Sequence, residues 1–328
     1  MFISLFGAVE SGIIYAIMAL GVYLTFRVLD FPDLTVEGSF VTGAAVAAFS
    51  IINGIPPIIA TLLAAVAGFI AGCITGVLHT KGKINSLLAG ILMMTALYSI
   101  NLRIMGQPTL SLLNETTLFG QLEEMWKSIG LDSMLNGILS ALGLEQLPST
   151  WAVLIIMVFI TFAIKILTDY YLKTEVGLAL RAIGDNKKMI RSLSANTDSL
   201  IIVGVGFSNA LVALAGGLIA QLGGFSDVNM GLGLIVIGLA SIIIGEALFG
   251  TKTVVRATLA VILGAVIYRI IVTLALRVDF LETGDMKLIT AVIVVAALVT
   301  PKIIQSRREK RRRIWKRQQL RTGGDGHA

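Results

Sequence analysis

Lys173-Thr-Glu-Val-Gly-Leu-Ala-Leu-Arg-Ala-Ile-Gly-Asp-Asn-Lys-Lys-Met-Ile-Arg-Ser-Leu-Ser-Ala-Asn-Thr197 is a polar segment between two long apolar runs. Its pattern predicts a short helix held outside a membrane. We expect Gly184 to end one helix, and Asp185 or Asn186 to cap the next by accepting a backbone N–H. The polar segment therefore predicts two consecutive short helices with a turn between them.

The second of these helices is amphipathic. At about 100° per residue, two sets of side chains fall on opposite faces. The apolar set is Met189, Ile190 and Leu193, and the basic set is Lys187, Lys188 and Arg191. Such a helix can pack its apolar face against another protein surface while its basic face stays in water. The pattern equally fits an interfacial loop whose basic residues only follow the excess of positive charge on the cytoplasmic side.

Composition places the whole chain in a membrane. Mean hydropathy is +0.88, 56% of the 328 residues are hydrophobic and 14% are charged, against about 25% charged residues in soluble domains. Several spans of about 20 residues use most of this length. An ATPase or a substrate-capture domain must therefore be another polypeptide. The net charge of +6 is concentrated in the tail and short loops, which indicates topology and not nucleic-acid binding.

The apolar runs predict an all-α polytopic membrane protein in one transmembrane domain, 1–328, with about nine transmembrane helices. The expected spans are about 3–26, 34–52, 58–78, 84–105, 150–172, 198–222, 230–249, 254–276 and 286–304. The start of the chain lacks a charged leader and a cleavage site, so we interpret it as a retained first span. The single Cys73 permits no intrachain disulfide.

Charge in the loops orients these spans. The basic tail, 305–328, is predicted to be cytoplasmic and in contact with anionic membrane lipid. With nine spans, the basic loops 79–83 and 251–252 and the coupling loop 173–197 are also cytoplasmic. The acidic loop 106–149, with an amphipathic helix near Trp126, and the acidic loop 277–285 are external. One orientation satisfies every loop.

The chain also contains a possible internal repeat. A shift of 194 residues pairs Phe31 and Asp33 with Phe225 and Asp227 without a gap. The repeat halves are about 1–105 and 198–304, and each contains an apolar helix that ends in a break. Chance similarity between two apolar stretches is the alternative. Because the copies start at the first and sixth spans, they would enter the membrane in opposite directions, as the inverted repeats of many transporters do.

The breaks and the spans carry the polar residues that could line a translocation pathway. Carboxylates in a membrane are costly and are functional candidates by default, although they can also cap helix N-termini; these are Asp33, Glu37 and Asp227. The other pathway candidates are Phe31, Asn85, Ser86, Thr95, Asn209 and Phe225. Such polar side chains, and Asn101 and Ser208 with them, often serve as interhelical hydrogen-bond partners instead.

Nothing in the sequence predicts catalysis. The histidines are His79 and His327 alone, no metal-ligand pair is present, and no Gly-rich loop ends in Gly-Lys-Ser or Gly-Lys-Thr. We therefore expect a transport subunit that is not an enzyme and binds no cofactor or metal directly. ATP and magnesium would be bound by a partner subunit.

Two motifs resemble a known family. Gly177-Leu-Ala-Leu-Arg181-Ala-Ile-Gly184-Asp-Asn186 resembles the coupling-helix loop of ABC-importer permeases of the branched-chain amino acid and ribose type. Phe31-Pro-Asp33-Leu-Thr-Val-Glu37-Gly-Ser39 resembles their first break. Its Glu37 departs from the pattern of the sugar permeases. The motif is most similar to a bacterial subgroup assigned to aromatic amino acids such as tryptophan or tyrosine.

The resemblance implies a mechanism of alternating access in a bacterial inner membrane. Two permease copies would form a central pathway, and an external binding protein would deliver the solute. The coupling loop, with Arg181 and residues 184–191 and Leu193, would seat in a groove of a separate ATPase subunit. The main rival is a stand-alone ion-coupled transporter or channel that uses the three carboxylates as an ion site. A membrane enzyme and a membrane scaffold that does not transport are more distant alternatives.

Overall fold

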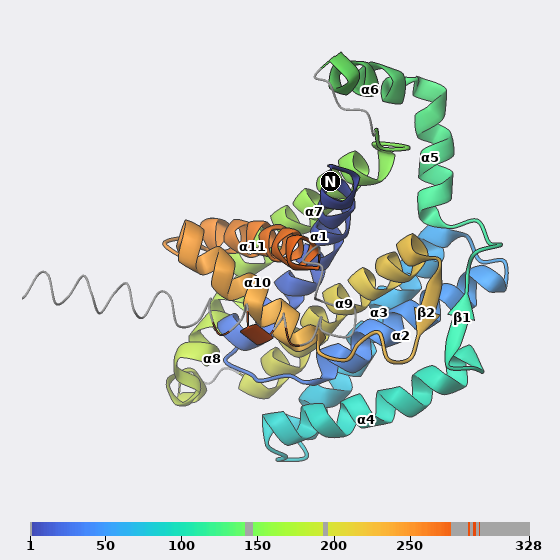
Figure 1. Cartoon of the computed structure of the whole chain (residues 1–328). Helices are drawn as coiled ribbons and strands as arrows, with labels where there is room; N and C mark the ends of the chain where they lie inside the picture. The colour runs from blue at the N-terminus through green and yellow to red at the C-terminus, as the bar shows by residue number, and fades with distance from the viewer. Residues whose placement is uncertain are drawn as a thin grey trace, which may run out of the picture.

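The computed structural model describes residues 2–141, 147–192 and 196–276 and a few isolated positions beyond. Within this part the chain is an all-α polytopic membrane protein, as predicted (Figure 1). The first half contains α1 (Phe2–Tyr23), a π-helical turn (Leu24–Val28), α2 (Thr35–Ile52), α3 (Pro57–Thr80), α4 (Ser86–Met105), β1 (Thr109–Ser111), α5 (Leu118–Ile129) and α6 (Leu131–Ala141). The second contains α7 (Ala152–Lys173), α8 (Glu175–Ser192), α9 (Thr197–Gly223), β2 (Phe225–Asp227), α10 (Leu234–Phe249) and α11 (Val254–Ala275).

The prediction of nine full-length spans is wrong in detail. Seven helices of the described chain are long and apolar enough to cross a membrane. The predicted seventh span, 230–249, is the shorter helix α10, because residues 230–233 form turns and the helix begins at Leu234. The acidic loop 277–285 and the tail, 305–328, lie outside the described residues, and the predicted ninth span, 286–304, does so apart from a few isolated positions.

The predicted break after the first span is confirmed. The last turn of α1 is π-helical, and the N–H of Leu29 donates to the carbonyl of Leu24 at 3.0 Å. Asp30 follows with a φ of 50°, a left-handed conformation that is uncommon for a residue other than glycine. Helix α2 starts only at Thr35. A second break, between α9 and α10, contains β2, which pairs antiparallel with β1.

Small residues let the central helices approach closely. A Cβ atom at Gly43 of α2 would overlap the carbonyl oxygen of Ala213 in α9, and one at Gly68 of α3 would overlap the side chain of Ala213. Helix α1 approaches α11 in the same way, because a Cβ atom at Gly12 would lie 3.1 Å from the Cα atom of Val266. Close backbone contact through small residues is the usual packing mode of helices in lipid.

This packing gives a first prediction. Gly43→Val should lower the free energy of unfolding by about 1–3 kcal/mol, because the added atoms force α2 and α9 apart. Thermal unfolding of the detergent-purified protein measures the loss. Gly137→Ala in α6 is the control, since its Cβ atom would meet no other atom within 4 Å. If the two variants unfold together, the α2–α9 contact does not limit stability.

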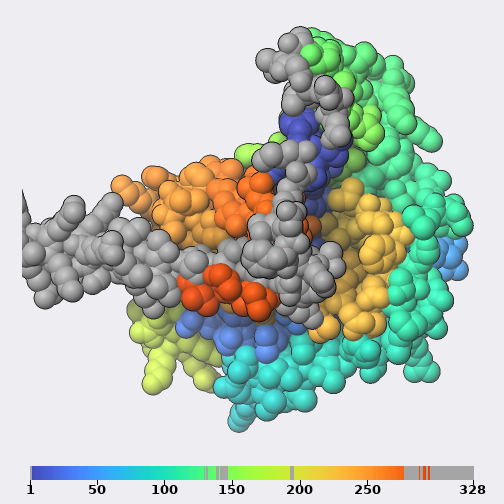
Figure 2. All heavy atoms as spheres, viewed as in Figure 1, coloured from blue at the N-terminus to red at the C-terminus, as the bar shows by residue number. Residues whose placement is uncertain are grey.

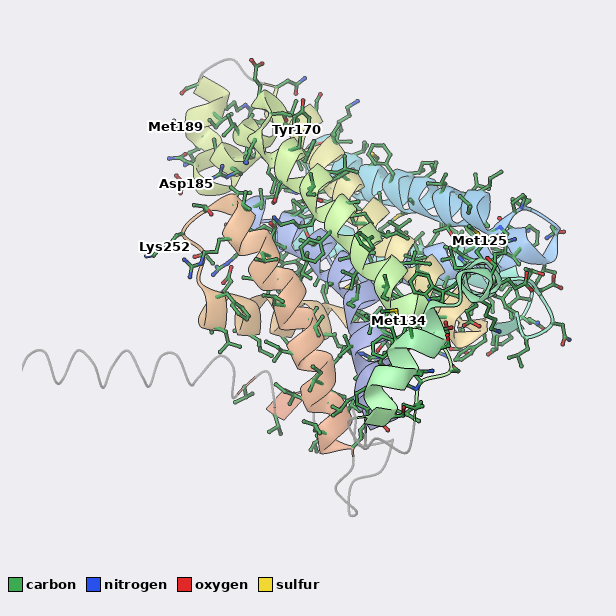
Figure 3. All side chains as sticks on the ribbon, turned by 90° about the horizontal axis from the view of Figure 1, so that it is seen from above. Met125, Met134, Tyr170, Asp185, Met189 and Lys252 are labelled. Carbon is green, nitrogen blue, oxygen red and sulfur yellow. The ribbon has the colours of Figure 1, made fainter. Side chains whose placement is uncertain are left out.

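The two predicted sides of the membrane are separated in the fold. Asp185, Met189 and Lys252, which are predicted to be cytoplasmic, gather at one end of Figure 3, away from Met125 and Met134 of the predicted external loop. That loop contains the predicted amphipathic helix, α5, in which Trp126 donates to Asp132 Oδ1 at 2.9 Å. Helices α5 and α6 stand at the upper edge of the molecule in Figure 2, and α4 forms its lower edge.

Candidate functional site

Helix α8 contains the predicted coupling segment, and its sequence explains its kink. Asn186 has non-helical angles (φ −153°, ψ 89°), and its Oδ1 accepts the backbone N–H of Met189 at 3.1 Å. The predicted cap is therefore Asn186. The expectation that Gly184 ends a helix is wrong, because the helical backbone continues through it to Asn186. Position 184 requires glycine for another reason, because a Cβ atom added there would overlap the carbonyl oxygen of Val28.

The faces of the second half of α8 differ in part from the prediction. Ile190 is buried, as the apolar face requires, but Met189 is 49% exposed. Met189 thus lies with the exposed basic residues Lys187, Lys188 and Arg191. Met189 and Ile190 are about 100° apart around the helix, so Ile190 can face the protein while Met189 faces solvent. Leu193 lies outside the described residues.

Helix α8 packs directly on the break that follows α1. One apolar cluster joins Leu29 and Phe31 of the break to Leu180, Ile183 and Ile190 of α8, and Ile201 and Val205 of α9 complete it. Gly184 lets the α8 backbone touch Val28 beside this cluster. The surface that is predicted to bind a partner is therefore in contact with residues 29–34, the non-helical segment between the first two membrane helices.

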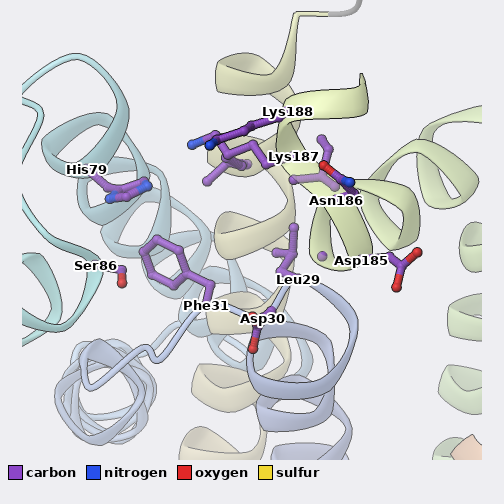
Figure 4. Close-up of a pocket in the computed structure, with 12 residues that line it drawn as sticks. Leu29, Asp30, Phe31, His79, Ser86, Asp185, Asn186, Lys187 and Lys188 are labelled. Atoms are coloured by element: carbon purple, nitrogen blue, oxygen red, sulfur yellow. The ribbon is translucent and has the colours of Figure 1, made fainter. Parts of the chain in front are cut away.

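A pocket of about 410 Å³ opens at this junction (Figure 4). Its walls come from the break, the end of α3, the start of α4, α8 and α9; they include Asp30, Phe31, His79, Ser86, residues 183–188 and Ile201. The Phe31 and His79 rings pack edge to face, with their centroids 5.2 Å apart. His79 Nδ1 lies 2.8 Å from the carbonyl oxygen of Ile84. Phe31 and Ser86, which were predicted to line a pathway, thus lie beside α8.

Sequence reasoning missed Asp30 as part of this junction. Its left-handed backbone and its place on the pocket wall mark a strained turn, and such strain is often found at sites that switch conformation. The sequence feature that could have identified Asp30 is its position directly before Phe31-Pro32, where the break begins.

A buried polar cluster lies just beyond the break. Asp33 is fully buried; its Oδ1 accepts the N–H of Thr35 at 2.9 Å, and its Oδ2 accepts Asn209 Nδ2 at 2.7 Å. The hydroxyl groups of Thr35 and Thr75 share a hydrogen bond of 2.8 Å. Asp33 therefore caps α2, which was one of its two predicted roles, and joins the first break to α9.

Glu37 lies one turn further along α2 and contacts the second break. Its Oε1 accepts the N–H groups of Gly233 at 3.0 Å and Ile235 at 3.5 Å, at the start of α10. Negative charge is favoured at a helix N-terminus. Glu37 and Thr95 also line a cavity of about 270 Å³ between α2, α4 and the β2–α10 connection. The fold thus brings these two predicted pathway residues to one cavity.

The remaining predicted pathway residues are elsewhere. Asn85 is an exposed N-cap of α4, accepting the N–H of Leu87 at 2.9 Å. Asp227 lies in β2, where it accepts from Thr109 Oγ1 at 2.5 Å, and Phe225 of the same strand is 48% exposed. In the part of the chain that the structure describes, no three side chains of His, Cys, Asp or Glu gather as metal ligands would.

A helical membrane bundle with broken helices, polar groups buried at the breaks and an amphipathic loop helix packed on one of them is the architecture of a membrane transport permease. The family described as the permease component of the branched-chain amino acid transport system matches residues 4–298, and this chain belongs to it.

Two relatives extend the comparison. The chain is 42% identical, over 88% of each chain, to the tyrosine transport system permease protein of Clostridioides difficile (strain R20291). It is 36% identical, over 64% of this chain and 65% of the relative, to the uncharacterized protein RP368 of Rickettsia prowazekii (strain Madrid E). No solved structure matches the chain.

Proposed function

We propose that this chain is the transmembrane permease subunit of an ATP-binding-cassette importer in a bacterial plasma membrane. It forms the translocation pathway for an amino acid of the aromatic class, as the name of the relative from Clostridioides difficile suggests. Separate ATPase subunits drive transport, an external binding protein delivers the solute, and two permease copies assemble around the pathway. The C-terminal tail lies in the cytoplasm.

The packing of α8 on the first break carries this proposal. A force on the exposed side of α8, which presents Lys187, Lys188, Met189 and Arg191, passes to Val28 through the Gly184 contact. From there it reaches the Asp33 cap and the start of α2. Because α2 also contacts α10 through Glu37, movement of α8 would shift both breaks together. This gives alternating access a direct mechanical route.

The first experiment is a mild-detergent pulldown of tagged protein from native membranes, with the co-purifying chains identified by mass spectrometry. We expect a stoichiometric Walker-motif ATPase. Lys187→Glu with Arg191→Glu should reduce its recovery roughly fivefold or more, because both exposed cations lie on the proposed docking surface. Lys81→Glu with Lys127→Glu makes the same change in net charge at other exposed positions and should retain the ATPase.

A homogeneous complex without an ATPase would contradict the proposal. The stand-alone ion-coupled transporter would then be the better interpretation. If both double variants lose the co-purifying ATPase equally, the overall charge of the protein, and not the α8 surface, controls how much ATPase is recovered.

A further inference from the structure

We infer that the cavity between α2 and α4 binds the ammonium group of the transported solute. This inference rests on the proposed transport function and adds the chemical feature that the pathway recognises. The cavity is lined by Glu37, Gly38, Val41, Met94, Thr95, Tyr98, Ser99, Asn101, Val228, Gly231 and Leu232. Its polar groups, which include the Glu37 carboxylate and the Asn101 amide oxygen as acceptors, are set among apolar side chains, which suits a cationic group on an apolar body.

Among the described residues that line it, the cavity has one charged side chain. Glu37 is the acidic residue on its wall, and none of the described residues that line it is Lys, Arg or His. Two backbone N–H groups at the start of α10 hold the Glu37 carboxylate in place. A carboxylate held by its surroundings in a partly apolar cavity attracts a cation more strongly than one in water.

Asn101 supplies an independent observation. Its side chain is 1% exposed and lines the same cavity, and its Nδ2 donates to the carbonyl of Gly38 at 3.2 Å. Among the described residues its Oδ1 has no hydrogen-bond partner. The amide cannot simply turn over, because that would place two oxygens against each other. A buried acceptor without a partner is costly, and an ammonium group offers three donors.

The cavity also lies at the right depth. A Cβ atom at Gly90 would meet the backbone N of Leu34, and one at Gly38 would meet Leu97 and Met94. Glu37 and Gly38 therefore pass α4 near its middle, about half-way along a helix of roughly 30 Å. The exposed residues Thr95, Tyr98 and Ser99 open the cavity on the outer side of α4, the side that we assign to the pathway.

The test measures charge selectivity at this position without any partner protein. Thr95→Cys is introduced into a Cys73→Ser background, and the new thiol is labelled in lipid nanodiscs. The two reagents are the cationic 2-(trimethylammonium)ethyl and the anionic 2-sulfonatoethyl methanethiosulfonates. Each rate is divided by the rate of the same reagent with a free thiol in solution. On this scale, we expect the cationic reagent to react with the Thr95→Cys thiol roughly tenfold faster than the anionic reagent, or more. Glu37→Gln should abolish this preference, whereas Glu10→Gln in α1 should preserve it.

Ligand protection tests the ammonium group itself. Tyramine and 4-ethylphenol differ by one amino group, and only tyramine should slow the labelling. Asn101→Leu should weaken that protection while the charge preference remains. Equal effects of the two compounds, or a charge preference that survives Glu37→Gln, would overturn the ammonium site. Failure of either reagent to reach the thiol would also overturn it, because the cavity would then face away from water.

The labelling result and the pulldown can fail separately. A cation-selective thiol with no co-purifying ATPase would preserve the site and contradict the proposed importer. A co-purifying ATPase together with a thiol that shows no charge selectivity would support the proposed importer and contradict the ammonium site.

Discussion

Gly184→Val should uncouple ATP hydrolysis from transport in reconstituted vesicles. A Cβ atom at Gly184 would overlap the carbonyl oxygen of Val28 and lie 3.0 and 3.1 Å from the carbonyl carbons of Val28 and Leu29. These atoms are backbone and cannot turn aside as a flexible side chain does. Helix α8 must then lift from the break, so a bound ATPase moves α8 without moving α2.

We expect the rate of transport per ATP hydrolysed to fall roughly 5- to 150-fold, the range that corresponds to a coupling free energy of about 1–3 kcal/mol. The measurement is paired: uptake of labelled amino acid and release of phosphate from the same proteoliposomes. Gly137→Val in α6 is the matched control, because nothing lies within 4 Å of its Cβ position. A Gly184→Val permease that transports at the wild-type ratio would show that the α8–break contact transmits no force.

A trivial folding defect must be separated from uncoupling. Gly184→Ala adds the same Cβ atom without the branched methyl groups, so its effect should be intermediate. The ATPase should still co-purify with both variants, because the exposed basic residues of α8 are unchanged. Loss of the ATPase together with loss of transport would point to misfolding of α8 and not to uncoupling.

Local chemistry made the break and the coupling segment predictable. Proline and acidic residues between two apolar runs signal an interruption, as Phe31-Pro32-Asp33 does. Asn186 was recognisable as a cap because its side chain needs only a backbone N–H three residues ahead. Both features depend on neighbours in the sequence, so neither needed knowledge of the fold.

The partners of the polar side chains could not be predicted in the same way. Helices in lipid are apolar on every side, so α10 and α11 carry no periodic signal that tells a packed face from a lipid-facing one. Glu37 meets Gly233 and Asp33 meets Asn209 across almost 200 and 176 residues of sequence. Asp227 does share the local bond of Asp33, since each Oδ1 accepts the N–H two residues ahead, but its Oδ2 accepts from Thr109 and not from a membrane helix. The division into repeat halves stays a prediction.

Asn209→Leu should be among the most destabilising single changes in the chain. It removes the Nδ2 donor from Asp33 Oδ2 and leaves a fully buried carboxylate that relies on the N–H of Thr35. Leaving a buried charged group without one of its hydrogen-bond donors costs about 3 kcal/mol or more. Gln221→Leu, also in α9, is the control; it removes only neutral bonds, to Thr61 Oγ1 and from the N–H of Leu118, and should cost about 1–2 kcal/mol. Thermal or denaturant unfolding in detergent compares the two.

Asp33→Asn then decides what the carboxylate is for. An amide keeps an oxygen for the N–H of Thr35 and turns its NH₂ group toward Asn209, whose Oδ1 has no partner among the described residues. Asn209 can turn to accept that donor at the loss of its bond to Val205. Stability should therefore change by about 1 kcal/mol or less.

If Asp33 only caps α2 and positions α9, transport by Asp33→Asn is retained. A stable Asp33→Asn protein that no longer transports would require the charge itself, and the carboxylate would then belong to the pathway or to an ion site. Unfolding and uptake measured on one preparation separate the two roles, because the cap needs an acceptor at this position, whereas an ion site needs a negative charge.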